Sequence, residues 1–193
     1  FEIINVDAEL YGADRRNLSE IQNHEKYEFV KGNITNKRLM EEIISKCDLV
    51  VNFAAESFVD RSISDANPFL VSNIRGAFTV LDIATKQKKR MVQISTDEVF
   101  GSLSSGTATE ESKLNPSSPY AATKAAAELL INSHFILHIC CLYRHGKISN
   151  SNPIDYLLFI QNGCGEGFAD LKLYTFVKQN KMYIDNRRIS LAF

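Results

Sequence analysis

The sequence predicts an α/β protein built on a doubly wound parallel sheet, and two observations carry this prediction. Short apolar and β-branched runs alternate with helical patterns over residues 3–135, which is typical of βαβ units whose strands lie parallel in one sheet. These runs mostly end in polar or small residues, and ligands of such folds bind at the carboxyl ends of the strands. The 193 residues are 45% hydrophobic and 23% charged, a composition that allows one core.

The expected elements follow in chain order. Thr35 is the expected N-cap of the first helix, and Leu70, Ile74, Phe78 and Leu81 mark one face of the second. The expected ranges are a strand over 3–6, an extended run over 27–31, a helix over 37–46, a strand over 48–54, a long helix over 70–81, a strand over 91–95 and a helix over 120–132.

The strand over 91–95 ends in a run of polar residues, Ser95, Thr96, Asp97 and Glu98. A buried parallel strand of this kind brings a hydroxyl, an acid and a base to one place. Two carboxyl groups in different environments can act separately as an acid and a base. The alternative is a solvated acidic turn.

A second candidate group begins the helix over 120–132. Ser118 and Pro119 provide an N-cap and a first-turn proline, and Tyr120 and Lys124 lie four residues apart on one helix face. The ammonium of Lys124 favours the phenolate of Tyr120. We therefore expect a lowered pKa for Tyr120, which would make it a general base.

Composition argues against several classes of function. The net charge is −1 with scattered Lys and Arg, so nucleic acid is not an expected partner. No apolar run approaches the ~18 residues of a membrane span, and we expect a cytoplasmic protein. No C-x-x-C spacing with paired histidines occurs, so we expect reduced thiols and no metal. The cysteines are Cys47, Cys140, Cys141 and Cys164.

These residues resemble the dTDP-glucose 4,6-dehydratases of the extended short-chain dehydrogenase/reductase superfamily. The likeness runs from about Ile3 to Leu130. Besides the Tyr-x-x-x-Lys pair and the polar run after the strand over 91–95, it includes residues 52–57 (Asn-Phe-Ala-Ala-Glu-Ser), 59–62 (Val-Asp-Arg-Ser) and 114–120 (Leu-Asn-Pro-Ser-Ser-Pro-Tyr). The resemblance implies a Rossmann-like fold, bound NAD and a nucleotide-sugar substrate.

The resemblance also implies which residues hold NAD. Asp7 would accept hydrogen bonds from the adenosine ribose, which favours NAD over NADP; capping a turn is the alternative. Asn33 replaces the usual Asp at adenine, and an amide can still accept and donate there. Helix packing for Ala54 and a helix-surface amide for Asn73 are the competing interpretations. The implied cofactor residues are Asp7, Asn33, Ile34, Phe53, Ala54, Ala55, Ser72, Asn73, Ser95, Tyr120 and Lys124.

The implied reaction is a dehydration. Tyr120 takes the proton of the sugar C4 hydroxyl while NAD⁺ accepts the C4 hydride and Thr96 hydrogen-bonds the oxygen. Glu98 then removes the C5 proton, Asp97 protonates the departing C6 hydroxyl, and the hydride returns to C6. Ser57, with Thr96, is the implied substrate contact, and Phe58 replaces the His usual there.

Two alternatives stay open. A nucleotide-sugar 4-epimerase needs only the Tyr, the Lys and a Ser or Thr. A non-catalytic Rossmann-fold remnant would keep the fold without the cofactor, because the Gly-x-x-Gly-x-x-Gly turn that binds the dinucleotide phosphates is absent from the sequence.

The chain also departs from the family at both ends. The first strand and its glycine turn are missing, and in the strand order 3-2-1-4-5-6 this loss would leave two apolar edges at the centre of the sheet. After residue 135 only Arg144 and a displaced Ser149-Asn150 match the family. We expect an incomplete NAD-binding domain over 1–145, a truncated substrate lobe over 146–193, a homodimer in the full-length form, and no turnover by the 193 residues alone.

Overall fold

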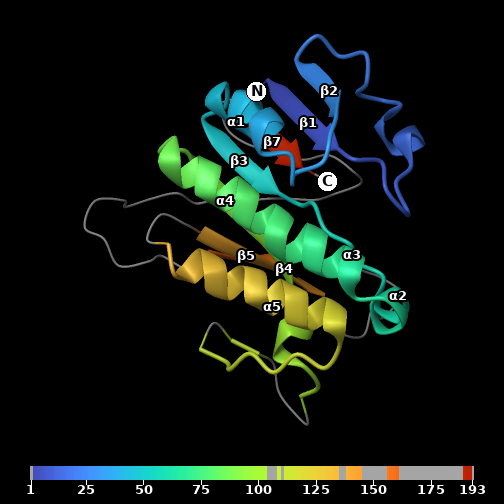
Figure 1. The fold of residues 1–193 in the computed structure, drawn as a ribbon, viewed down its shortest axis with the longest axis vertical. Helices are drawn as coiled ribbons and strands as arrows, with labels where there is room; N and C mark the ends of the chain where they lie inside the picture. The colour runs from blue at the N-terminus through green and yellow to red at the C-terminus, as the bar shows by residue number, and fades with distance from the viewer. Residues whose placement is uncertain are drawn as a thin grey trace.

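The structure is a computed structural model that describes residues 2–103, 108–109, 111–134, 138–144, 156–160 and 189–192. Its sheet has the strand order β2-β1-β7-β3-β4-β5-β6, shown in Figure 1. Neighbouring strands are parallel except for the antiparallel pair β5 and β6. The strands are β1 (Ile3–Asp7), β2 (Tyr27–Lys31), β3 (Leu49–Asn52), β4 (Arg90–Thr96), β5 (His138–Arg144), β6 (Tyr156–Ile160) and β7 (Ile189–Ala192).

The parallel sheet with helical crossovers confirms the predicted fold class. As predicted, β3 and β4 are adjacent and parallel. Helices α1, α4 and α5 lie side by side over one face of the sheet (Figure 1). The helices are α1 (Lys37–Ser45), α2 (Val59–Ser64), α3 (Asn67–Phe69), α4 (Ala77–Lys86) and α5 (Pro119–Asn132), with 3₁₀ turns η1 (Arg15–Leu18) and η3 (Asp97–Phe100) and a π segment η2 (Leu70–Gly76).

The centre of the sheet differs from our expectation. We expected two exposed apolar edges there, and this was wrong. Strand β7 fills the gap and pairs in parallel with β1 on one side and β3 on the other, so that Ile189 lies opposite both Ile3 and Leu49. Unpaired main-chain groups in the middle of a covered sheet are costly. Strand β7 pairs with the main-chain groups along the facing edges of β1 and β3.

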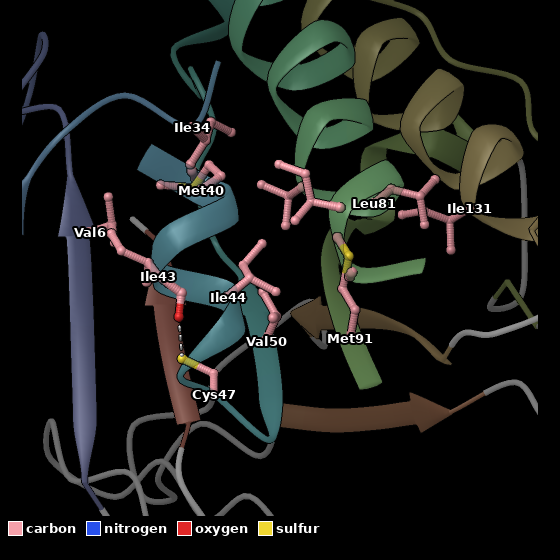
Figure 2. Close-up of a cluster of buried hydrophobic side chains, with 14 residues drawn as sticks. Val6, Ile34, Met40, Ile43, Ile44, Cys47, Val50, Leu81, Met91 and Ile131 are labelled. Atoms are coloured by element: carbon pink, nitrogen blue, oxygen red, sulfur yellow. Dashed lines mark hydrogen bonds between the residues drawn. The ribbon is translucent and has the colours of Figure 1, made fainter. Parts of the chain in front are cut away.

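The core lies between this sheet and the three long helices. Figure 2 shows Val6 of β1, Val50 of β3 and Met91 of β4 packing against side chains of α1, α4 and α5. The buried thiol of Cys47 donates to the main-chain oxygen of Ile43 at 3.3 Å. The core therefore ties together strands from both sides of β7.

Two local predictions were wrong. The N-cap of α1 is Asn36, not Thr35, because the Thr35 hydroxyl donates instead to Asn33 Oδ1 at 2.7 Å. Leu70 and Phe78 are 46% and 42% exposed. The π segment widens the turn before α4 and rotates the apolar face. The side chains that this stretch of helix buries instead include Phe69, Asn73, Ala77, Val80, Leu81 and Ala84.

Among the described residues, no helix is long and apolar enough to cross a membrane. Within the same ranges, no three His, Cys, Asp or Glu side chains gather in a way that could hold a metal ion. Cys164, Ser149 and Asn150 lie outside the described residues. The predicted boundary between 145 and 146 stays a prediction.

Candidate active site

A pocket of about 300 Å³ opens at the carboxyl ends of β1, β2 and β3. Parallel strands bring their carboxyl ends to one edge of the sheet, so loops far apart in sequence meet there. Seven of the predicted site residues line this pocket: Asp7, Asn33, Ile34, Ala54, Ala55, Ser57 and Ser72. The structure therefore brings the β1, β2 and β3 parts of the expected cofactor site together.

Two polar residues of the pocket also hold its loops. Asp7 Oδ1 accepts a hydrogen bond from the Glu9 main-chain N–H at 2.6 Å, which is the turn-capping role that the sequence left open. Asn33 Oδ1 accepts from the main-chain N–H of Thr35 at 2.9 Å. Such Asx turns fix the direction of the chain. Asp7 lines the pocket with acceptor capacity to spare, whereas both lone pairs of Asn33 Oδ1 are taken by Thr35, so that the amide N–H group of Asn33 is its remaining polar group.

Three residues that line the pocket, Tyr11, Glu56 and Phe58, form a cluster with Arg61 that the sequence analysis missed. The rings of Tyr11 and Phe58 meet edge to face with centroids 5.2 Å apart, and the Arg61 guanidinium lies 3.9 Å from the Tyr11 centroid. Arg61 also pairs with the buried Glu56 at 2.8 Å. These contacts join the loop after β1 to the start of α2. The sequence signals were the family-like segments 52–57 and 59–62, which contain Glu56 and Arg61, and the replacement of His by Phe58.

A second cluster lies at the end of β4. Thr96 is the last residue of the strand and caps η3, since its hydroxyl accepts from the Glu98 main-chain N–H at 3.4 Å. Asp97 and Glu98 form the first turn of η3. The tail of η3 is held by Asn115, whose N–H donates to Val99 O at 2.9 Å. The strand end thus presents a hydroxyl and two carboxyl groups, as the sequence predicts.

Helix α5 carries the rest of this cluster. Ser118 is its N-cap and accepts from the Ala121 N–H at 3.1 Å, which confirms the prediction. The main-chain N–H of Tyr120 donates to Ser62 Oγ of α2 at 3.1 Å. The first turn of α5 is therefore anchored twice. Tyr120 and Lys124 are both buried, at 9% and 4% exposure.

The Tyr120 phenol of α5 and the polar side chains at the end of β4 share one electrostatic environment. Burial raises the pKa of Tyr120, a hydrogen bond with the Thr96 side chain lowers it, and the charges of Glu98 and Asp97 raise it further. Partial desolvation and the charge of the neighbouring Asp97 raise the pKa of Glu98, which remains an exposed residue. Tyr120 therefore lies within electrostatic reach of Thr96, Asp97 and Glu98.

The expected lowering of the Tyr120 pKa by Lys124 was wrong for this structure. The net shift of the Tyr120 pKa is upward, with burial as its largest cause. The Lys124 ammonium donates to the main-chain oxygen of Ile94 at 2.5 Å. The charges of Glu98 and Asp97 act on the Tyr120 phenol in the same direction as burial.

Five predicted cofactor residues are not among the residues that line the pocket: Tyr120 and Lys124 of α5, and Phe53, Asn73 and Ser95. Ser95 is buried, and its hydroxyl donates to the Glu128 carboxylate of α5. Asn73 is 2% exposed, so it is no helix-surface amide. Its amide group accepts from Glu56 N at 2.8 Å and donates to Glu56 O and Thr123 Oγ1, each at 2.9 Å. Asn73 therefore connects a pocket loop to the helix that carries Tyr120.

The chain is similar to known nucleotide-sugar enzymes. The family model for GDP-mannose 4,6 dehydratase matches residues 1–142. The low-salt glycan biosynthesis protein Agl12 of Haloferax volcanii is 43% identical over 137 residues, which are 70% of this chain and 44% of that protein. The dTDP-glucose 4,6-dehydratase of Streptomyces griseus is 42% identical over 134 residues, 69% of this chain and 40% of that enzyme.

Among solved structures, the dTDP-glucose 4,6-dehydratase DesIV of Streptomyces venezuelae, with NAD and TYD bound, superposes with a TM-score of 0.70 at 38% identity. The superposition covers 75% of this chain and 48% of DesIV. A UDP-glucuronic acid 4-epimerase of Bacillus cereus has a TM-score of 0.66 at 23% identity, which shows a shared fold. The chain spans less than half the length of the relatives it matches.

Proposed function

Because this chain belongs to the GDP-mannose 4,6-dehydratase family, we propose that it forms the cofactor-binding part of a 4,6-dehydratase that converts dTDP-glucose to dTDP-4-keto-6-deoxyglucose with bound NAD. The observation that carries this proposal is the pair Asp97 and Glu98 in η3, which packs against the helix that begins with Pro119 and Tyr120. An epimerase reverses its own oxidation at one carbon and uses no further acid or base. A dehydratase also moves protons at two neighbouring carbons.

The pocket residues fit NAD. Ala54 and Ala55 follow β3 with small side chains that let a dinucleotide approach the main chain. Asp7 supplies oxygen acceptors at the end of β1, and Asn33 supplies amide donors after β2. Asp7 would hold the adenosine ribose, and Asn33 with Ile34 would contact the adenine. When bound, NAD supplies a hydride acceptor that is restored within each turnover.

Thr96, Asp97 and Glu98 at the end of β4, with Tyr120 and Lys124 of α5, form what we call the β4–α5 cluster. Its residues share the proposed proton transfers among them. Tyr120 accepts the proton of the C4 hydroxyl, and Thr96 holds that oxygen by a hydrogen bond. Glu98, whose pKa is raised by partial desolvation and by Asp97, takes the C5 proton, because a base is most effective when its pKa approaches the working pH. Asp97 delivers a proton to the departing C6 hydroxyl. Lys124 and Ser57 complete the proposed cofactor and substrate contacts.

The experiment is a chimera in which residues 1–142 replace the matching segment of the Streptomyces griseus enzyme, called the dehydratase chimera below. It supplies the glycine turn and the substrate lobe. We expect the sugar product to lose the mass of one water, and Tyr120→Phe to abolish both NAD reduction and water loss. A folded chimera that isomerises the sugar without loss of mass would support an epimerase instead. One that folds but does not bind NAD would support a non-catalytic remnant.

Three further predictions follow from this proposal and are separate from its chemistry. We expect the enzyme to be cytoplasmic and the full-length form to be a homodimer, and we expect no turnover from these 193 residues by themselves. Subcellular fractionation, light scattering and the mass assay, respectively, test them.

A further inference from the structure

Helix α5 buries a carboxyl group that the proposed reaction does not use. Glu128 is 6% exposed and lies one turn beyond Lys124 on the face that packs on β4. Its carboxylate accepts a hydrogen bond from Ser95 Oγ. Burying a carboxylate between a helix and a sheet costs several kcal/mol unless it is well hydrogen-bonded. An apolar side chain would pack at this position without that cost.

Three successive turns of α5 meet three successive residues of β4. Lys124 Nζ donates to Ile94 O at 2.5 Å, and Glu128 accepts from Ser95. Tyr120 lies close enough to Thr96 for the Thr96 side chain to lower the pKa of the Tyr120 phenol. The first two contacts lie on the strand directly before Thr96. They fix how far the strand end extends along the helix, and hence where Thr96 stands relative to Tyr120.

We propose that Glu128 is a positioning residue that acts through Ser95: its hydrogen bond holds the end of β4 against α5 so that the Thr96 hydroxyl meets the Tyr120 phenol. The role depends on the acceptor oxygen and not on the charge. It rests on the proposed function for the meaning of the Thr96–Tyr120 pair, but its test needs neither substrate nor cofactor.

The test measures the pKa of the residue-120 phenol in the 193-residue chain. A difluorotyrosine placed at position 120 alone titrates at lower pH than tyrosine and gives a single ¹⁹F NMR signal. Glu128→Ala and Ser95→Ala should each raise its pKa by about one unit, because the hydrogen bond from Thr96 to the phenolate weakens. The double variant should raise it no further than either single variant.

Glu128→Gln keeps an acceptor oxygen for Ser95, so its phenol pKa should stay close to that of the parent. Ser133→Ala removes a hydroxyl from the far end of α5, where it donates to Leu130 O, and should change nothing. A pKa that stays constant or falls in folded Ser95→Ala overturns the proposal. So does Glu128→Gln if it raises the pKa as much as Ser95→Ala. If Glu128→Ala does not fold, Ser95→Ala and Glu128→Gln still decide the matter.

Discussion

The cofactor pocket and the β4–α5 cluster lie at the same edge of one sheet but are held by different means. The pocket is built from loops after β1, β2 and β3. Asx turns shape two of these loops, and exposed contacts of Tyr11 and Phe58 join the loop after β1 to the loop after β3. The β4–α5 cluster stands on a strand end and a helix start, and buried or partly buried hydrogen bonds connect its elements. The geometry of this cluster is therefore preset, whereas the pocket depends on how its loops are spaced.

Two features set that spacing. Within the described sheet, β7 joins the β1–β2 half to the β3–β4–β5 half, and Asn73 ties the loop after β3 to α5. Disrupting either one should affect the pocket and the cluster together. Changes inside the pocket or inside the cluster should affect only one of them.

The largest expected effect comes from Ser190→Pro in β7. Proline removes a ladder hydrogen bond and leaves a buried acceptor unsatisfied, so we expect the free energy of unfolding to fall by about 3 kcal/mol or more. Urea denaturation measures this change. Lys37→Pro is the matched control, because it falls at the first position of α1, where proline is tolerated. Equal stabilities of the two variants would show that β7 does not join the halves.

Asn73→Ala should lower the free energy of unfolding somewhat less, by about 2 kcal/mol. The variant removes the hydrogen bonds that Asn73 makes to the buried main-chain N–H and C=O of Glu56. Hydrogen exchange should rise both at residues 54–57 and in the first turns of α5. The exposed Asn67 offers a control, Asn67→Ala, with little effect on either region. Faster exchange in only one region would argue against Asn73 as the connection.

Asp7→Ala should act on the pocket alone. Loss of a hydrogen bond to a charged acceptor should weaken NAD binding to the dehydratase chimera by about tenfold or more and reduce its preference for NAD over NADP. Calorimetric titration of both cofactors measures this. Asp14, which caps η1 and does not line the pocket, provides the control Asp14→Ala. Unchanged affinity in Asp7→Ala would remove Asp7 from the cofactor site.

The smallest expected effect is a shift in pH dependence within the cluster. Glu98 acts as a base only when ionised, and its pKa is raised by partial desolvation and by Asp97. The dehydration rate of the chimera should therefore fall on acidification at a higher pH than for an ordinary glutamate. In the chimera without substrate, Asp97→Asn removes the neighbouring charge, so the Glu98 carboxyl should titrate at lower pH in ¹³C NMR while NAD affinity stays constant. A Glu98 titration that does not move would show that the Asp97 charge does not act on Glu98.

Much of this arrangement was predictable from local sequence. Strand ends at Asp7 and Thr96, the Ser118 cap and the helix bearing Tyr120 each follow from patterns of a few residues, which the structure confirms. Seven of the pocket residues were predicted through the resemblance to the dehydratases, and the parallel strands explain why they meet at one edge of the sheet.

The parts that were missed depend on distant contacts. Nothing near residues 189–192 indicates that β7 pairs with β1 and β3, since parallel pairing over such a separation leaves no local pattern. The pKa of Tyr120 depends on burial and on two carboxylates from another element. Asn36 and Thr35 are both good caps, and only the bond from Thr35 to Asn33 decides between them.

The central claim is that Asp97 and Glu98 serve elimination while Tyr120 serves oxidation. A single turnover of dTDP-glucose by the dehydratase chimera tests it, with NADH absorbance followed beside the mass of the sugar. In Asp97→Asn or Glu98→Gln we expect NADH to form and persist while loss of water slows by about 10²–10⁴-fold. Water loss at the parent rate in either variant would contradict the account by showing that the carboxyl group has no catalytic role.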